Sequence, residues 1–212
     1  LSTRTEGDVA NMFLHTEGDH YRTSVSFEAH PDEHFYGLGQ EQQDHFDRKG
    51  GSYDLMHFNT KSTIPYVYSS LGYGFLWNNP APGHVELGKN RTLWCADSTY
   101  QADFLVFVGD APADAAKTYA DLTGYAPRFP DWAGGFWQCK LRYWNQEQLL
   151  EVAREYKRRG LKIDVIVCDF FHWPKMGDCR FDPEFFPDPA AMGKELDEMG
   201  IELMVSVWPQ VA

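Results

Sequence analysis

The chain has 212 residues, of which 43% are hydrophobic and 24% charged, and its formal net charge is -12. Phosphate contacts need clustered Lys and Arg, so a chain this acidic is expected to bind neither nucleic acid nor an anionic membrane. No run approaches the roughly 18 consecutive apolar residues of a membrane-spanning helix. Aromatic residues make up 16% of the chain, which suits an all-β core and also a surface that stacks on flat ligand faces.

Residues 1–128 carry the pattern of short β-strands, because runs of aromatic and β-branched residues alternate with clusters of Gly, Pro, Asn and Asp. The expected strands are Thr23–Phe27, Tyr66–Ser69, Tyr73–Trp77, Leu93–Cys95 and Phe104–Val108. Strands at this spacing predict an antiparallel β-sandwich. One helix is expected over Pro112–Thr123, since proline suits the first helical turn and Gly124 can end the helix.

The pattern changes after Ala126–Trp132, a stretch with two prolines that is predicted to be an extended linker. Residues 129–212 then alternate between strand and helix patterns. The expected strands are Gly135–Cys139, Ile163–Cys168 and Ile201–Val207, and the expected helices are Asn145–Arg159 and Ala190–Met199. This order predicts a parallel sheet with right-handed crossovers. Three strands make a small parallel sheet, so we interpret them as the first part of a (β/α)₈ barrel that the chain does not complete.

The cysteines carry no pattern of a bound group. Cys95, Cys139, Cys168 and Cys179 form no CxxC pair, so neither a zinc site nor a thioredoxin-type redox pair is expected. Thiols without a disulfide framework favour a reducing compartment such as the cytoplasm, although they leave the localisation undetermined.

The candidate site lies where the predicted parallel strands end, because barrel enzymes place their functional groups at the C-terminal ends of strands. Asp169 follows the buried run Val165–Cys168 and directly precedes Phe170 and Phe171. A carboxylate accepts hydrogen bonds from sugar hydroxyls, and aromatic rings stack on the apolar face of a pyranose. The pattern is therefore typical of a sugar site, although an Asp at a strand end also caps loops.

Two further strand-end residues have both a binding and a structural interpretation. Trp208 can form a wall of the same pocket or pack in the barrel core. Arg142 can hold a hydroxyl-rich ligand or lie in solvent. Asp182 and Asp188 each precede a proline and are interpreted as turn and helix-start residues rather than as acid–base catalysts. His172 is interpreted as solvated or packed in the core.

An ordered set of motifs resembles glycoside hydrolase family 31, the α-glucosidase and α-xylosidase family. The motifs are Phe35–Gln40, Leu71–Leu76, Pro130–Tyr143, Asp164–Asp169, Phe181–Pro183, Phe186–Pro189 and Val205–Pro209. The resemblance implies a galactose-mutarotase-like β-sandwich followed by a (β/α)₈ catalytic barrel. It also implies cleavage of α-glycosidic bonds with retention, by one nucleophilic carboxylate and one acid–base carboxylate, without a cofactor or metal.

The resemblance places both catalytic carboxylates beyond the end of this chain, so no residue here is expected to be catalytic. Asp169 matches the Asp that binds hydroxyls of the sugar whose bond is cut. Trp208 matches an aromatic wall of that pocket, and Arg142 lies in a stretch that borders it. Phe170 and Phe171 stand where family members vary, and we expect them to affect the choice between xylose and glucose.

Two functions remain open from the sequence. The first is a fragment of a retaining α-glycosidase that hydrolyses α-xylosidic or α-glucosidic bonds in oligosaccharides. The second is a non-catalytic carbohydrate-binding or scaffolding protein. The partner expected in both cases is an oligosaccharide, and the oligomeric state is left open, a homo-oligomer included.

Overall fold

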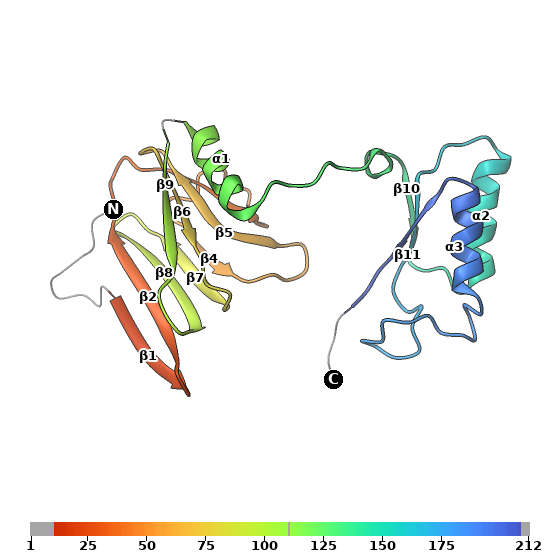
Figure 1. Cartoon of the computed structure of the whole chain (residues 1–212), viewed down its shortest axis with the longest axis horizontal. Coiled ribbons are helices and arrows are strands. Elements are labelled where there is room, and N and C mark those ends of the chain that lie inside the picture. The colour runs from red at the N-terminus through yellow and green to blue at the C-terminus, as the bar shows by residue number, and fades with distance from the viewer. Residues whose placement is uncertain (1–10, 110, 209–212) are drawn as a thin grey trace. The chain divides into compact units, whose positions relative to one another are not determined.

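The structure is a computed structural model that describes residues 11–109 and 111–208. The chain forms two compact units, Leu1–Ala126 and Pro127–Ala212, which are connected by an exposed stretch (Figure 1). This division lies two residues before the boundary predicted at residue 128.

The first unit contains two antiparallel sheets. One has the order β1-β2-β8-β7-β4, formed by Asn11–Glu17, His20–Glu28, Arg91–Thr99, Gly83–Leu87 and Ser52–Leu55. The other has the order β3-β5-β6-β9, formed by Phe35–Gln40, Ser62–Ser69, Tyr73–Trp77 and Phe104–Val108. The predicted sandwich is confirmed, and each of the five predicted strands is present. The sequence patterns did not reveal β1, β3, β4 and β7.

Aromatic side chains from both sheets form the core of the sandwich. The ring of Phe75 on β6 lies 4.9 Å from that of Trp94 on β8 and 5.6 Å from that of Phe27 on β2. Fully burying such a side chain stabilises the fold by about 1.5–3 kcal/mol. Because neighbouring residues of a strand point to opposite faces, Leu76 points out of the core that holds Phe75. There it packs against Ala115 of α1 (Pro112–Thr123), a helix with the predicted bounds.

The second unit contains three parallel strands in the order β10-β11-β12, formed by Trp137–Lys140, Val165–Cys168 and Glu202–Val205. The helices α2 (Gln146–Arg158) and α3 (Pro189–Glu198) follow the first and second strands. The linker prediction is wrong at its end, where Asp131–Gly134 form one turn of 3₁₀-helix. Pro130 pre-sets the backbone for this turn, and its carbonyl accepts a hydrogen bond from the N–H of Ala133 at 3.0 Å.

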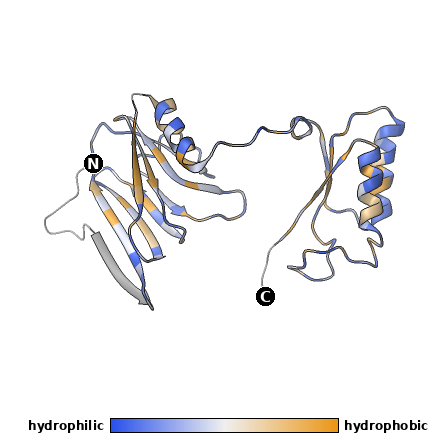
Figure 2. Cartoon of the chain, in the orientation of Figure 1, coloured by the Kyte–Doolittle hydropathy of each residue, from blue (hydrophilic) through white to orange (hydrophobic). Residues whose placement is uncertain are grey.

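Both helices of this unit begin at the side-chain caps that the sequence indicated. Oδ1 of Asn145 accepts a hydrogen bond from the N–H of Gln148 at 2.9 Å and so caps α2. Oδ1 of Asp188 accepts a hydrogen bond from the N–H of Ala191 at 2.9 Å and caps α3. The apolar face of α2 packs with that of α3 against the sheet; this core includes Leu149, Leu150, Ala153, Ile166, Met192 and Leu196. Figure 2 shows the matching alternation of hydrophilic and hydrophobic residues along both helices.

Candidate functional site

The parallel sheet carries its two helices on one face only. The register aligns Gln138, Ile166 and Leu203, and Ile166 and Leu203 belong to the core beneath the helices. Alternate residues point the other way, so Cys139 and Met204 lie on the opposite face, where both are exposed. This second face is called the open face below.

Asp169 lies at the C-terminal end of β11, on the open face. Its Oδ1 accepts a hydrogen bond from the N–H of Phe170 at 2.8 Å, and the thiol of Cys139 lies 3.7 Å from its Oδ2. Burial, and then the negative charge of Asp169, raise the pKa of the Cys139 thiol. Cys139 is therefore protonated at neutral pH and acts as a weak donor to the carboxylate. The carboxylate keeps further lone pairs for hydrogen bonds from a ligand.

Aromatic rings extend from Asp169 to the end of the described chain. The rings of Phe170 and Trp208 are stacked, with centroids 5.1 Å apart and planes inclined by 6°. Phe170 also lies 4.2 Å from the ring of Phe171, and Trp173 lies 6.3 Å from Trp208. Phe171 and Trp208 are 46% and 45% exposed, so this aromatic cluster presents ring surface to solvent.

Arg142 joins the aromatic cluster instead of lying in solvent. Its guanidinium carbon is 3.9 Å from the ring centroid of Trp144 and 5.1 Å from that of Phe171. Cations over aromatic faces at these distances are attracted by the ring quadrupole. Nε of Arg142 is buried and has no hydrogen-bond partner within the described residues. The guanidinium therefore has donor capacity left for a ligand.

Phe171 has a backbone conformation that non-glycine residues rarely adopt. Its φ is 64°, in the left-handed region, which costs about 1–3 kcal/mol where the surrounding structure enforces it. This conformation follows directly after the residue that stacks on Trp208. Such strain is found at ligand sites more often than elsewhere, which fits the position of the aromatic cluster.

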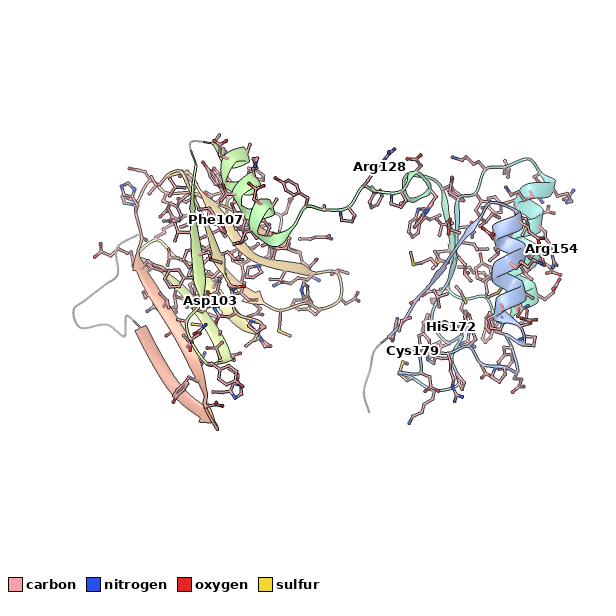
Figure 3. The ribbon with its side chains drawn as sticks, viewed as in Figure 1. Asp103, Phe107, Arg128, Arg154, His172 and Cys179 are labelled. Carbon is pink, nitrogen blue, oxygen red and sulfur yellow. The ribbon has the colours of Figure 1, made fainter. Side chains whose placement is uncertain are left out.

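The remaining polar residues of the same loop have structural roles. Asp182 accepts from the N–H of Glu184 at 3.0 Å, in agreement with its interpretation as a turn residue. His172 is only 3% exposed and its Nδ1 lies 3.1 Å from the main-chain oxygen of Asp169. It is therefore the core-packed histidine, and it fixes the loop that carries the site. Figure 3 labels His172 in this loop.

The structure brings Phe170, Phe171, Trp208 and Arg142 into one chain of ring contacts, with Asp169 beside Phe170. No hydrogen bond or ion pair joins Asp169 to Arg142 in the part of the chain that the structure describes. Across residues 11–109 and 111–208, no group of His, Cys, Asp and Glu could hold a metal ion and no helix could span a membrane.

Sequence reasoning missed the contact between Cys139 and Asp169. Cys139 is aligned with Val167 in the parallel register, and Asp169 follows Val167 by two residues, on the same face. The alignment of the two strands is the signal that would have revealed the contact, but periodicity within one strand does not give it.

Comparison with known proteins shows two matching family models. Residues 3–86 match the N-terminal galactose mutarotase-like domain of glycosyl hydrolase 31, and residues 126–212 match the TIM-barrel domain of glycosyl hydrolases family 31. The chain belongs to glycoside hydrolase family 31. Its fold is accordingly an antiparallel β-sandwich followed by a parallel β/α segment of a TIM barrel, as the sequence predicted.

Individual relatives of this family 31 chain match most of its length. An uncharacterized family 31 glucosidase from Pseudescherichia vulneris is 49% identical over 92% of the chain, and an α-xylosidase from Saccharolobus solfataricus is 37% identical over 89%. A crystal structure of a family 31 α-xylosidase from a soil metagenome, complexed with xylose, is 52% identical over 95% of the chain, with a TM-score of 0.86. The chain spans 37%, 27% and 30% of these three proteins, respectively.

Membership of the family gives the open face a place in the fold. In a TIM barrel the helices surround the strands, so the face opposite α2 and α3 is the inner face of the barrel. Asp169 and the aromatic cluster then lie at the C-terminal ends of barrel strands, the end at which barrel enzymes bind their substrates.

Proposed function

We propose that this chain contributes the sugar-binding side of the active site of a retaining α-glycosidase that hydrolyses α-xylosidic or α-glucosidic bonds in oligosaccharides. The observation that carries the proposal is the placement of Asp169 beside Phe170, whose ring contacts the partly exposed rings of Phe171 and Trp208, at the strand ends of a family 31 barrel segment. The 52% identity to a structure that contains xylose supports it.

In this proposal each side chain has a separate task. Asp169 accepts hydrogen bonds from two hydroxyls of the sugar whose glycosidic bond is cut, and Phe170 N–H holds its carboxylate in place. Trp208 gives the sugar an apolar wall, and Arg142 donates to a further hydroxyl with the donors that its ring contacts leave free. Cleavage requires two more carboxylates and no cofactor, and no residue of this chain is assigned either catalytic role.

The ring pair of Phe170 and Phe171 supports xylose as the preferred sugar. The centroids lie 4.2 Å apart, so the pair fills space beside Asp169. Xylose lacks the exocyclic hydroxymethyl group of glucose and needs less room at such a wall. Two of the relatives described above are α-xylosidases.

The proposal is tested in the full-length protein that contains this chain, with aryl α-xylosides and aryl α-glucosides as substrates. Asp169→Asn is expected to lower kcat/KM by about 100-fold, because hydrogen bonds to a charged group contribute about 1.5–3 kcal/mol each. Asp182→Asn is the matched control, since the amide oxygen still accepts from Glu184 N–H, and it should leave kcat/KM unchanged. Unchanged kinetics of Asp169→Asn would refute the assignment.

The same assay separates the two functions that the sequence left open. We expect the full-length protein to hydrolyse at least one of the two substrate classes and the 212-residue chain alone to hydrolyse neither. Turnover by the pure chain would contradict the placement of the catalytic carboxylates outside it. Binding without turnover by the full-length protein would instead support a non-catalytic carbohydrate-binding protein.

A further inference from the structure

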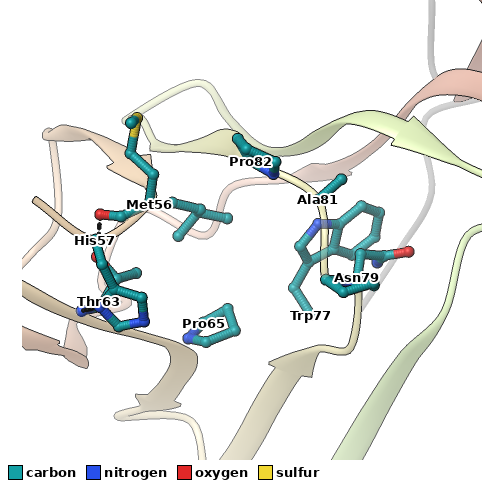
Figure 4. A pocket seen from close by; sticks show the side chains of 10 residues that line it. Met56, His57, Thr63, Pro65, Trp77, Asn79, Ala81 and Pro82 are labelled. Atoms are coloured by element: carbon teal, nitrogen blue, oxygen red, sulfur yellow. Dashed lines mark hydrogen bonds between the residues drawn. The ribbon is translucent and has the colours of Figure 1, made fainter. Parts of the chain in front are cut away.

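The first unit contains a cavity of about 420 Å³ on the sandwich, between the segment that joins β4 to β5 and the segment that joins β6 to β7 (Figure 4). Its apolar walls include Met56, Pro65, Pro80 and Pro82. The volume lies within the range of roughly 300–1,000 Å³ that is typical of small-molecule sites. We call it the Trp77 cavity, after the residue with the largest side chain in its wall.

Trp77 contributes a hydrogen-bond donor that has no partner. The residue is 1% exposed, and its indole Nε1 makes no hydrogen bond within the described residues. In Figure 4 the five-membered ring of Trp77 is turned toward the side of the cavity on which Met56, His57 and Pro65 lie. Leaving a buried donor unsatisfied costs about 1–3 kcal/mol. Nε1 presents almost no surface to the cavity, so an oxygen atom of a ligand removes this cost once a small movement of the wall lets it approach.

His57 contributes a second donor, and its orientation is fixed. Its Nδ1 accepts a hydrogen bond from the N–H of Thr63 at 3.1 Å, and the Thr63 hydroxyl donates to the Met56 carbonyl at 2.9 Å. A neutral imidazole whose Nδ1 accepts carries its proton on Nε2. Nε2–H therefore remains as a donor at the wall that His57 forms.

The chemistry of the wall defines the class of ligand. No Asp, Glu, Lys or Arg side chain lines the Trp77 cavity, so it selects a neutral molecule. The two donors require acceptor oxygens on that molecule. The proline rings and the indole require apolar C–H faces, which stack on such surfaces. A pyranose ring combines hydroxyl oxygens with C–H faces and carries no charge.

We propose that the Trp77 cavity binds a pyranose unit of an oligosaccharide, as a sugar site of the sandwich that does not use Asp169. Trp77 Nε1–H and His57 Nε2–H donate to ring or hydroxyl oxygens of the sugar, and Pro65 and Pro82 contact its C–H face. The proposal goes beyond the glycosidase function and does not depend on it, because every residue that it uses lies in the first unit.

The test is a titration of the ¹⁵N-labelled chain with methyl α-D-xylopyranoside and with isomaltose, followed through the indole N–H signals. Trp77→Phe identifies the Trp77 signal by its loss. That signal is expected to shift and to saturate on titration. His57→Ala, at an exposed position, should raise Kd about fivefold for one lost hydrogen bond. The ¹⁵N spectrum of this variant checks that the fold is kept, because the substitution also removes the acceptor of the Thr63 N–H. His45→Ala removes an exposed imidazole outside the cavity and should leave Kd unchanged.

Two controls make the outcome decisive. Asp169→Asn must leave the Trp77 titration unchanged, so that failure of the proposed glycosidase site and failure of this site are distinguished. Glycerol must not reproduce the shift, since an equal effect would mean an adventitious additive only. If Trp77→Phe does not fold, the His57→Ala and His45→Ala pair still decides the question. The absence of a saturable shift with both sugars, or an unchanged Kd in His57→Ala, would overturn the proposal.

Discussion

A buried ion pair in the sandwich allows the sharpest prediction about stability. Nζ of Lys61 lies 3.1 Å from Oε1 of Glu41, and the two side chains are only 4% and 5% exposed. Nζ donates a hydrogen bond to the carbonyl of Asp54 at 2.6 Å, whereas Oε1 of Glu41 accepts none within the described residues. The pair is therefore held together by charge and not by an aligned hydrogen bond. At an effective dielectric constant of about 20 the attraction is about 5 kcal/mol. Desolvation opposes it with several kcal/mol per ion.

The two opposing terms nearly cancel for the intact pair, but a single substitution leaves one charge buried and uncompensated. Glu41→Gln and Lys61→Met are therefore each expected to lower the free energy of unfolding by about 3–5 kcal/mol. The double variant leaves neither charge buried and should therefore cost less than either single one, which corresponds to a coupling energy of at least about 3 kcal/mol.

Urea denaturation, followed through amide signals of β7 and β8, measures these free energies for the unit that contains the pair. Lys117→Met is the matched control, because it breaks an exposed ion pair with Asp121, and it should leave the free energy of unfolding unchanged. Additive effects of Glu41→Gln and Lys61→Met would show that the two residues do not act as a pair and would refute the reasoning.

Three more predictions concern single side chains. Leu196→Ala removes a fully buried side chain of the second unit and should lower its free energy of unfolding by about 2–5 kcal/mol in the same urea experiment. Burial raises the pKa of Asp47, but hydrogen bonds, above all from His34, outweigh it and lower the pKa. The stability that Asp47 contributes is therefore complete above its unfolded-state pKa and is lost as pH falls through the lower folded-state pKa. Below about pH 4, the free energy of unfolding of Asp47→Asn should therefore fall less steeply with decreasing pH than that of the unsubstituted chain. Iodoacetamide should alkylate Cys139 slowly, because its thiol is exposed but its pKa is raised, and should alkylate Cys168 still more slowly, because that thiol is buried and burial raises its pKa to about 12. Equal labelling of the two cysteines in mass spectrometry of the folded chain would contradict this.

The elements that the sequence predicted well are those whose signals are local. Both the hydrophobic periodicity of α2 and its cap at Asn145 are contained in a few neighbouring residues, and so is the continuous apolar run of β11. The strand β7 was hidden because Gly83 continues a cluster of turn residues. In the structure the glycine is required by a close approach between strands, since a Cβ there would lie 2.0 Å from the carbonyl oxygen of Cys95. That reason exists only once β7 and β8 are paired.

The strand β5 shows the same limit in another way. Its sequence pattern was recognised only from Tyr66 onward because Pro65 lacks the N–H that a ladder needs. The structure tolerates the proline inside Ser62–Ser69 because the pairing with β3 shifts register there, between Gly37 and Gly39. For the site, strand-end position was enough to select Asp169 and its neighbouring rings. The stacking of Phe170 on Trp208 depends on how β11 and β12 align, which the sequence does not express.

The order of strands in the sandwich affects how the chain folds during synthesis. β2 pairs on one side with β1, which precedes it, but on the other side with β8, where Glu28 meets Arg91. Until the ribosome has released Arg91–Thr99, one edge of β2 exposes main-chain donors and acceptors together with the apolar residues that later form the core. The nascent chain therefore passes through a stage at which this edge can pair with other chains.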